Sequence, residues 1–195
     1  MLNKNFIFLA LVIAVYGNFF YIRDTLKGQT KPNRVSFFLW GLAPLISFFA
    51  QLKASAGIQI IYTLSVSILA FAILLASLYN KNAFWKISKF DILCGGFALL
   101  ALIILITTNQ PILVLVLSVL ADFFAALPTL IKSYNYPNTE TTSAYAIEII
   151  GSAITLLTIH HFTFTKFFFA GYILLMNSLF TALLSFSPKK VKAKA

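Results

Sequence analysis

The chain has 195 residues, of which 60% are hydrophobic and only 10% charged, and its mean hydropathy is +0.91. A soluble domain carries about a quarter charged residues, so this chain has too little polar surface to fold as a globule in water, and its expected solvent is the lipid bilayer. The net charge of +10 does not predict a nucleic-acid partner, because the basic residues lie in short breaks between long apolar runs.

Seven stretches are long and apolar enough to predict membrane-spanning helices, which need roughly 20 residues each. They are residues 6–22, 35–51, 57–79, 91–108, 111–131, 142–159 and 167–186. The breaks between them carry Gly, Pro, Asn and Lys, which are loop signals. No small-x-small cleavage pattern closes the first run, so we predict a retained helix there. The predicted fold is an all-α membrane protein with a single transmembrane domain over residues 1–195.

The basic residues predict how the helices are oriented in the membrane. One end of the bundle holds the N-terminus and the second, fourth and sixth loops, and it carries Lys4, Lys53 and Lys166. The other end carries the remaining twelve of the fifteen Lys and Arg residues. We therefore expect the N-terminus outside and the C-terminus in the cytoplasm. The expected location is the plasma (inner) membrane, as a multi-pass protein.

The central run predicts an internal duplication. Residues 97–106 contain no polar residue, so the helix over 91–108 can face lipid on most sides. The flanking segments 6–79 and 111–186 each hold three predicted helices. A single linker helix makes two three-helix units point the same way, so we expect a 3+1+3 arrangement of parallel repeats, of a kind found in transporters.

The end of the fifth predicted helix carries a recognisable motif. It reads Leu127-Pro128-Thr129, then Lys132, and is followed by Asn138-Thr139 and Ser143. This pattern resembles the PQ-loop of the SWEET-like seven-helix transporters, in which a Leu-Pro-Gln starts the motif; here Thr129 replaces the Gln. The first half holds a weaker counterpart over residues 21–36 that lacks the proline. The resemblance implies a 3+1+3 transporter with its N-terminus outside.

Two acidic residues lie within the predicted spans, Asp122 in the fifth and Glu148 in the sixth. A carboxylate inside the membrane is costly and must face protein or water. No basic residue lies at the same depth to pair with either acid. Each is therefore a candidate for proton coupling and for binding a cationic or hydroxylated substrate. The alternative is a protonated acid that hydrogen-bonds a neighbouring helix for structure alone.

Three further residues are candidates for substrate binding. Asn177 resembles the pocket asparagine of SWEET transporters, and its amide both donates and accepts hydrogen bonds. Trp40 can stack on a ligand or anchor its helix at the membrane interface. Ser152 continues the polar stripe that contains Glu148. For Asn177 and Ser152, the alternative is close packing between helices.

Pro128 and Pro44 are candidate hinges, because a proline inside a helix removes one backbone hydrogen bond and creates a bending point. The alternative for both is a static kink that helps packing. No nucleotide-binding motif is present, and the adjacent His160 and His161 point in different directions on a helix. Neither an enzyme, nor a metal site, nor a cofactor is therefore expected.

The sequence predicts a membrane transporter for a small polar solute, either sugar-like or another metabolite, that works by alternating access. Transport would be facilitative or proton-coupled. The alternative is a membrane receptor or adaptor of PQ-loop architecture without transport activity. The expected partners are a small-molecule substrate and the lipid bilayer, and both a monomer and a homo-oligomer remain possible.

Overall fold

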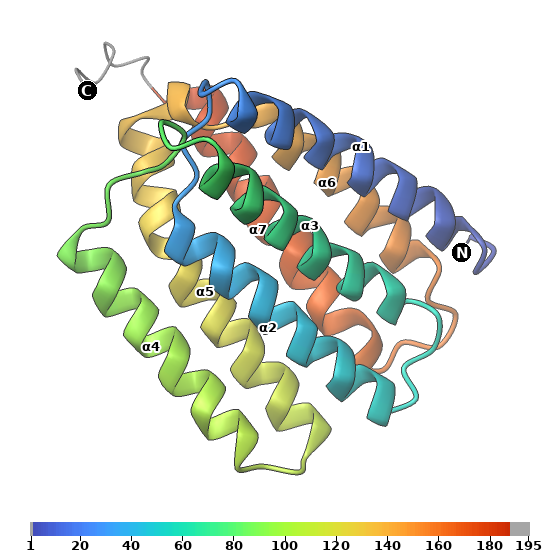
Figure 1. Ribbon diagram of the computed structural model, residues 1–195. Helices are drawn as coiled ribbons and strands as arrows, with labels where there is room; N and C mark the ends of the chain where they lie inside the picture. The colour runs from blue at the N-terminus through green and yellow to red at the C-terminus, as the bar shows by residue number, and fades with distance from the viewer. Residues whose placement is uncertain (1, 188–195) are drawn as a thin grey trace.

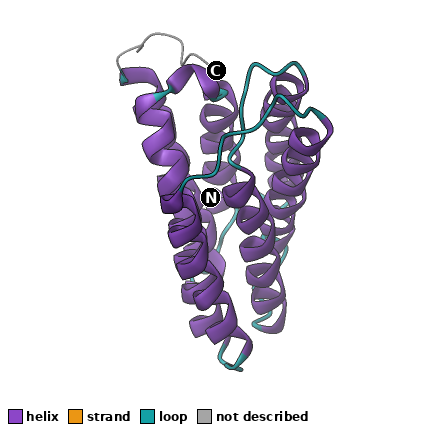
Figure 2. Cartoon of the chain, turned by 60° about the vertical axis from the view of Figure 1, so that its left-hand side comes forward, coloured by secondary structure: helices purple, strands orange, loops and turns teal. Residues whose placement is uncertain are grey.

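The computed structural model describes residues 2–187, without the side chains of residues 101, 105 and 106, and this part of the chain is helical with no strand. Figures 1 and 2 show long helices joined by short loops. The helices are α1 (Phe6–Leu26), α2 (Arg34–Lys53), α3 (Ile60–Tyr79), α4 (Lys89–Ile106), α5 (Pro111–Asn135), α6 (Thr142–Leu157) and α7 (Phe164–Phe186). A short 3-10 turn, η1 (Pro137–Thr139), lies between α5 and α6.

Five of these helices, α1, α2, α3, α5 and α7, are long and apolar enough to cross a membrane. Helix α6 is a shorter apolar helix of 16 residues. Large apolar side chains are exposed along one face of α1, among them Phe8, Val12 and Tyr16 at helical spacing. Exposed apolar stripes of this kind suit contact with lipid, and the chain is a helical multi-pass membrane protein.

Helices α1 and α5 extend further than the sequence predicts, since they end at Leu26 and Asn135 rather than at residues 22 and 131. The prediction ended both helices where the first charged residue appears. In the structure these charged residues lie within the last turns of the helices, and each forms an ion pair. Arg23 pairs with Asp24 at 2.8 Å, and Lys132 pairs with Glu140 at 2.5 Å.

Helix α3 begins at Ile60, three residues later than predicted. The chain turns before it at Gly57, whose φ of +89° lies in the left-handed region that favours glycine. Helix α7 begins at Phe164, three residues earlier than predicted, directly after the extended residue Thr163. These differences move the helix ends by less than one turn.

The helices pack in a repeated pattern (Figure 1). Within the first half α3 lies against α1 and α2, and within the second half α7 lies against α5 and α6. Between the halves, α1 packs on α6 and α2 packs on α5. Helix α4 packs on α5 and α2 at the outside of the bundle.

Small and hydroxyl residues allow the close contacts between the halves. A Cβ added to Gly17 of α1 would lie 2.9 Å from the Cγ2 of Ile147 in α6, so only glycine fits there. Helices α2 and α5 are joined by two hydroxyl pairs: Ser47 with Ser118 at 2.7 Å, and Thr129 with Ser36 at 2.9 Å.

Candidate ligand-binding cavity

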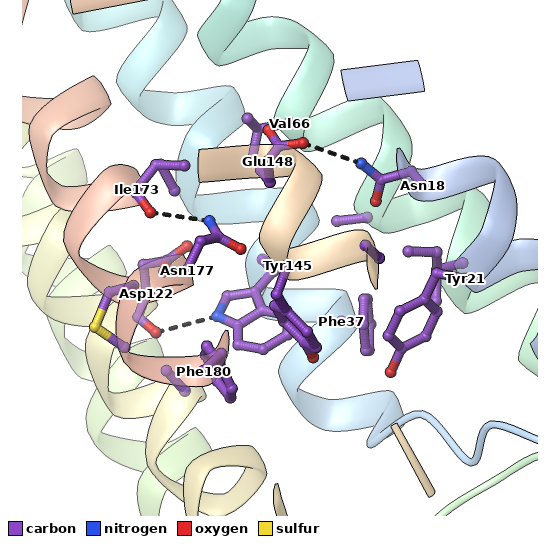
Figure 3. Close-up of a pocket in the computed structure, with 16 residues that line it drawn as sticks. Asn18, Tyr21, Phe37, Val66, Asp122, Tyr145, Glu148, Ile173, Asn177 and Phe180 are labelled. Carbon is purple, nitrogen blue, oxygen red and sulfur yellow. Dashed lines mark hydrogen bonds between the residues drawn. The ribbon is translucent and has the colours of Figure 1, made fainter. Parts of the chain in front are cut away.

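A cavity lies between the two halves of the bundle, and every helix except α4 contributes to its wall (Figure 3). The cavity has a volume of about 100 Å³. A single water needs about 10–15 Å³ by this measure, so the cavity has room for several waters or for a small polar molecule.

Four of the five residues predicted to bind substrate line this cavity: Asn177, Trp40, Asp122 and Glu148. The fifth, Ser152, is not among the residues that line it. The hydroxyl of Ser152 is buried and lies 2.9 Å from the carbonyl oxygen of Glu148 and 3.0 Å from that of Ile149. Ser152 thus hydrogen-bonds within its own helix, as the packing alternative describes.

Glu148 lies in the cavity wall with only 7% of its surface exposed. The hydroxyl of Tyr62 donates to its Oε1 at 2.6 Å, and the amide of Asn18 reaches its Oε2 at 3.4 Å. Figure 3 shows the Asn18 contact as a dashed line across the gap between α1 and α6. Both partners come from the first half of the chain and both are neutral.

Asp122 lies on α5, in the same half of the chain as Glu148, with 4% of its surface exposed. The hydroxyl of Tyr172 donates to its Oδ2 at 2.7 Å. In the described part of the chain no hydrogen bond reaches its Oδ1. Its backbone carbonyl accepts from the indole of Trp40 at 3.3 Å, which links α5 to α2.

The amide nitrogen of Asn177 donates to the carbonyl oxygen of Ile173, one turn earlier in α7, at 2.9 Å (Figure 3). Among the described residues no donor reaches the amide oxygen of Asn177. The side chain is therefore fixed by its own helix and presents a free acceptor to the cavity.

Five aromatic side chains of the wall form a closed ring of contacts. The contacts run from Tyr21 to Phe37, Trp40, Phe180, Tyr145 and back to Tyr21, with neighbouring centroids 4.7–6.1 Å apart. These distances are typical of favourable aromatic pairs. The ring draws on α1, α2, α6 and α7, so it joins both halves of the bundle.

The hydroxyls of Tyr21 and Tyr145 point away from this ring of aromatic contacts and donate to Glu140 Oε2 at 2.6 and 2.9 Å. Glu140 also pairs with Lys132, and both side chains are almost fully buried, at 0% and 1% exposure. Lys132 Nζ lies 5.3 Å from the ring centroid of Trp85 and donates to the carbonyl oxygen of Lys31. We call Tyr21, Tyr145, Glu140 and Lys132 the loop-end cluster.

A second cavity lies beyond the loop-end cluster, and the residues that line it include Asp24 at the end of α1 and the loop residues Thr30 and Thr141. Glu140 lines this second cavity, whereas Tyr21 and Tyr145 line the central one. The loop-end cluster is thus the partition between the two cavities. Across the same loops the hydroxyls of Thr30 and Thr141 lie 2.6 Å apart.

Pro44 and Pro128 are buried within α2 and α5, which continue as helices through both positions. Neither proline lines the central cavity. Because α2 packs directly on α5, the two prolines lie on one packed pair of helices.

The tyrosine partners of the acids were not predicted from the sequence: Tyr62, Tyr172, Tyr21 and Tyr145. No role was predicted for Glu140, and Lys132 was identified only as part of the PQ-loop-like motif and of the basic end of the bundle. One signal was available, because a tyrosine hydroxyl inside an apolar span needs a partner when it is buried. That signal does not say which acid each tyrosine meets.

The fold and the cavity together define a helical membrane protein with an acidic, aromatic-walled site between its two halves. Comparison with family models, curated proteins and solved structures finds no match for the chain. Among the described residues no three His, Cys, Asp or Glu side chains come together as metal ligands.

Proposed function

We propose that this protein is a transporter for a small polar solute, of the PQ-loop or SWEET-like class, which works by alternating access. The observation that carries the proposal is the pair of cavities separated by the loop-end cluster. A transporter needs a site between two gates, and the cluster is built as one gate. It closes through three side-chain contacts that converge on Glu140.

In this proposal the halves 6–79 and 111–186 are parallel repeats and α4 is the linker. The reciprocal packing supports it, since the first helix of each half lies against the second helix of the other. The loop-end cluster would face the cytoplasm, because the basic residues gather at that end. Rocking of one half against the other would open the cluster and close the opposite end, with Pro128 and Pro44 as bending points.

The proposal is tested by solute uptake into liposomes that contain the purified protein. We expect saturable uptake of at least one small polar solute over protein-free liposomes, with a proton gradient across the membrane as the added variable. Stimulation by the gradient would show proton coupling, for which Asp122 and Glu148 are the candidate residues, whereas equal rates would make transport facilitative. Ligand binding without any flux would overturn the transporter and favour a receptor or adaptor.

A further inference from the structure

The charges of the central cavity are not balanced. Its wall holds two carboxyls, those of Asp122 and Glu148, and none of the described residues that line it is Lys, Arg or His. The hydrogen-bond partners of both acids are neutral hydroxyl and amide groups. A buried carboxylate requires a positive partner or a proton. Glu140, by contrast, has Lys132 at 2.5 Å.

The wall also offers more open hydrogen-bond acceptors than open donors. Most donors are engaged inside the protein: Asn18 donates to Ala14 and Glu148, and Trp40 donates to the carbonyl of Asp122. Asn177 donates one N–H to a carbonyl of its own helix, and its second N–H has no described partner. The hydroxyls of Tyr21 and Tyr145 donate to Glu140. The open groups are mostly acceptors, since no described donor reaches Asp122 Oδ1 or Asn177 Oδ1. This wall suits a ligand that brings donors.

The aromatic ring supplies the third feature. Five aromatic side chains line one continuous part of the same cavity. The faces of Trp, Tyr and Phe attract cations, and the attraction grows when the cation leaves water. A sugar could stack on such rings, but its hydroxyls would also require several donors, and the only amide N–H of this wall without a described partner is the second one of Asn177.

We propose that the central cavity binds an organic cation with N–H groups, an ammonium or a guanidinium, at Asp122, Glu148 and the aromatic ring. This inference rests on the proposed function, since it names the substrate class of the same site. The cation donates to the open oxygens of Asp122 and Asn177. Its apolar part lies against the aromatic ring. The ligand thereby supplies the counter-charge that the wall lacks.

The test uses pairs of probes that differ in charge but hardly in shape: butylamine with 1-butanol, and butylguanidine with butylurea. Glucose and sucrose serve as hydroxyl-rich probes. The purified full chain in detergent is heated with each probe at millimolar concentration. A ligand that binds the folded state raises the melting temperature by mass action. We expect a dose-dependent rise with at least one of the two cations and none with its neutral partner.

Variants then assign the effect to the cavity. Asp122→Asn and Glu148→Gln keep the shape of each side chain and remove its charge, and each is expected to weaken cation binding at least tenfold. Asp24→Asn makes the same chemical change outside the central cavity and should leave the shift unchanged. If an acid variant fails to fold, Phe180→Leu opens the aromatic ring without touching a carboxyl and should weaken the cation about fivefold.

The proposal is overturned if no cation raises the melting temperature, if a neutral partner acts equally, or if the shift survives in Asp122→Asn and Glu148→Gln. A shift with sugars alone would also overturn it. Flux measurements separate this failure from that of the proposed function. Cation binding without liposome flux keeps the ligand class and removes the transporter. Flux of a neutral solute without cation binding would keep the transporter and remove the cationic ligand class.

Discussion

The central cavity and the loop-end cluster both bury carboxyl groups that accept hydrogen bonds from tyrosine hydroxyls, yet they differ in charge balance. Glu140 faces Lys132 within a buried ion pair. Asp122 and Glu148 have only neutral partners. In the loop-end cluster the negative charge is neutralised within the protein. In the central cavity the carboxyls would need a positive charge from outside the protein. The first suits a gate and the second a binding site.

The physical reason is the cost of an unpaired charge in a medium of low dielectric. Removing one partner of a buried ion pair is strongly destabilising because the other charge is left behind. When a carboxyl has no charged partner, its removal leaves no unpaired charge buried in the protein. The same acid-to-amide substitution should therefore cost much more stability in the loop-end cluster than in the central cavity.

The largest expected effect comes from a disulfide that crosslinks the two loops beside the loop-end cluster and so prevents the cluster from opening. The Thr30 and Thr141 hydroxyls are close enough that cysteines at both positions should reach disulfide geometry. In a Cys94→Ala background, oxidation of Thr30→Cys/Thr141→Cys should reduce liposome flux more than tenfold, and a reductant should restore it. The single-cysteine variants are the controls. Full flux through a chain with a proven disulfide would show that this end does not open during transport.

The next effect concerns stability. Glu140→Gln leaves the buried Lys132 without its charged partner and should destabilise the protein by about 3–5 kcal/mol. Asp122→Asn, in the unbalanced region, should change the free energy of unfolding by less than about 1 kcal/mol. Thermal unfolding of both variants in one detergent measures the difference.

The double variant Lys132→Met/Glu140→Gln serves as the control for this comparison. It removes both charges and should be more stable than Glu140→Gln alone, because no unpaired charge remains. A double variant that loses as much as the sum of both single variants would mean that the charges do not interact.

Pro128→Ala tests whether movement of α5 contributes to gating. Alanine restores the backbone donor that proline lacks and stiffens the helix. Transport should slow several-fold while ligand binding changes little. The measurement compares liposome flux with the ligand-induced melting shift for the same variant. Equal losses of both would favour a static kink.

The smallest effect is expected at Ser152, where the hydroxyl bonds within α6. Ser152→Ala should leave the affinity for the cavity ligand within about twofold of the unchanged chain. Asn177→Ala removes an open acceptor from the wall and should weaken the ligand by a larger factor. A loss at Ser152 that matches the loss at Asn177 would place Ser152 in the binding site after all.

Hydropathy and charge alone were enough to predict seven helices and to single out the acids. A run of apolar residues predicts a spanning helix wherever it occurs, because the backbone must satisfy its own hydrogen bonds in lipid. Asp122 and Glu148 stood out for the same reason, since an acid inside such a run is rare. The ends of α1 and α5 were missed, because partners for Arg23 and Lys132 keep the charged turns helical.

The composition of the cavity wall depended on tertiary packing. Tyr62 meets Glu148 across 86 positions of sequence, and Tyr172 meets Asp122 across 50. Such contacts depend on how each helix is rotated about its axis, which is set by close packing at residues such as Gly17. The sequence by itself thus determined that the chain is a helical membrane protein with two acids in its spans. Only the tertiary structure decided which acid has a positive partner, because that partner is brought in by folding rather than by spacing along one helix.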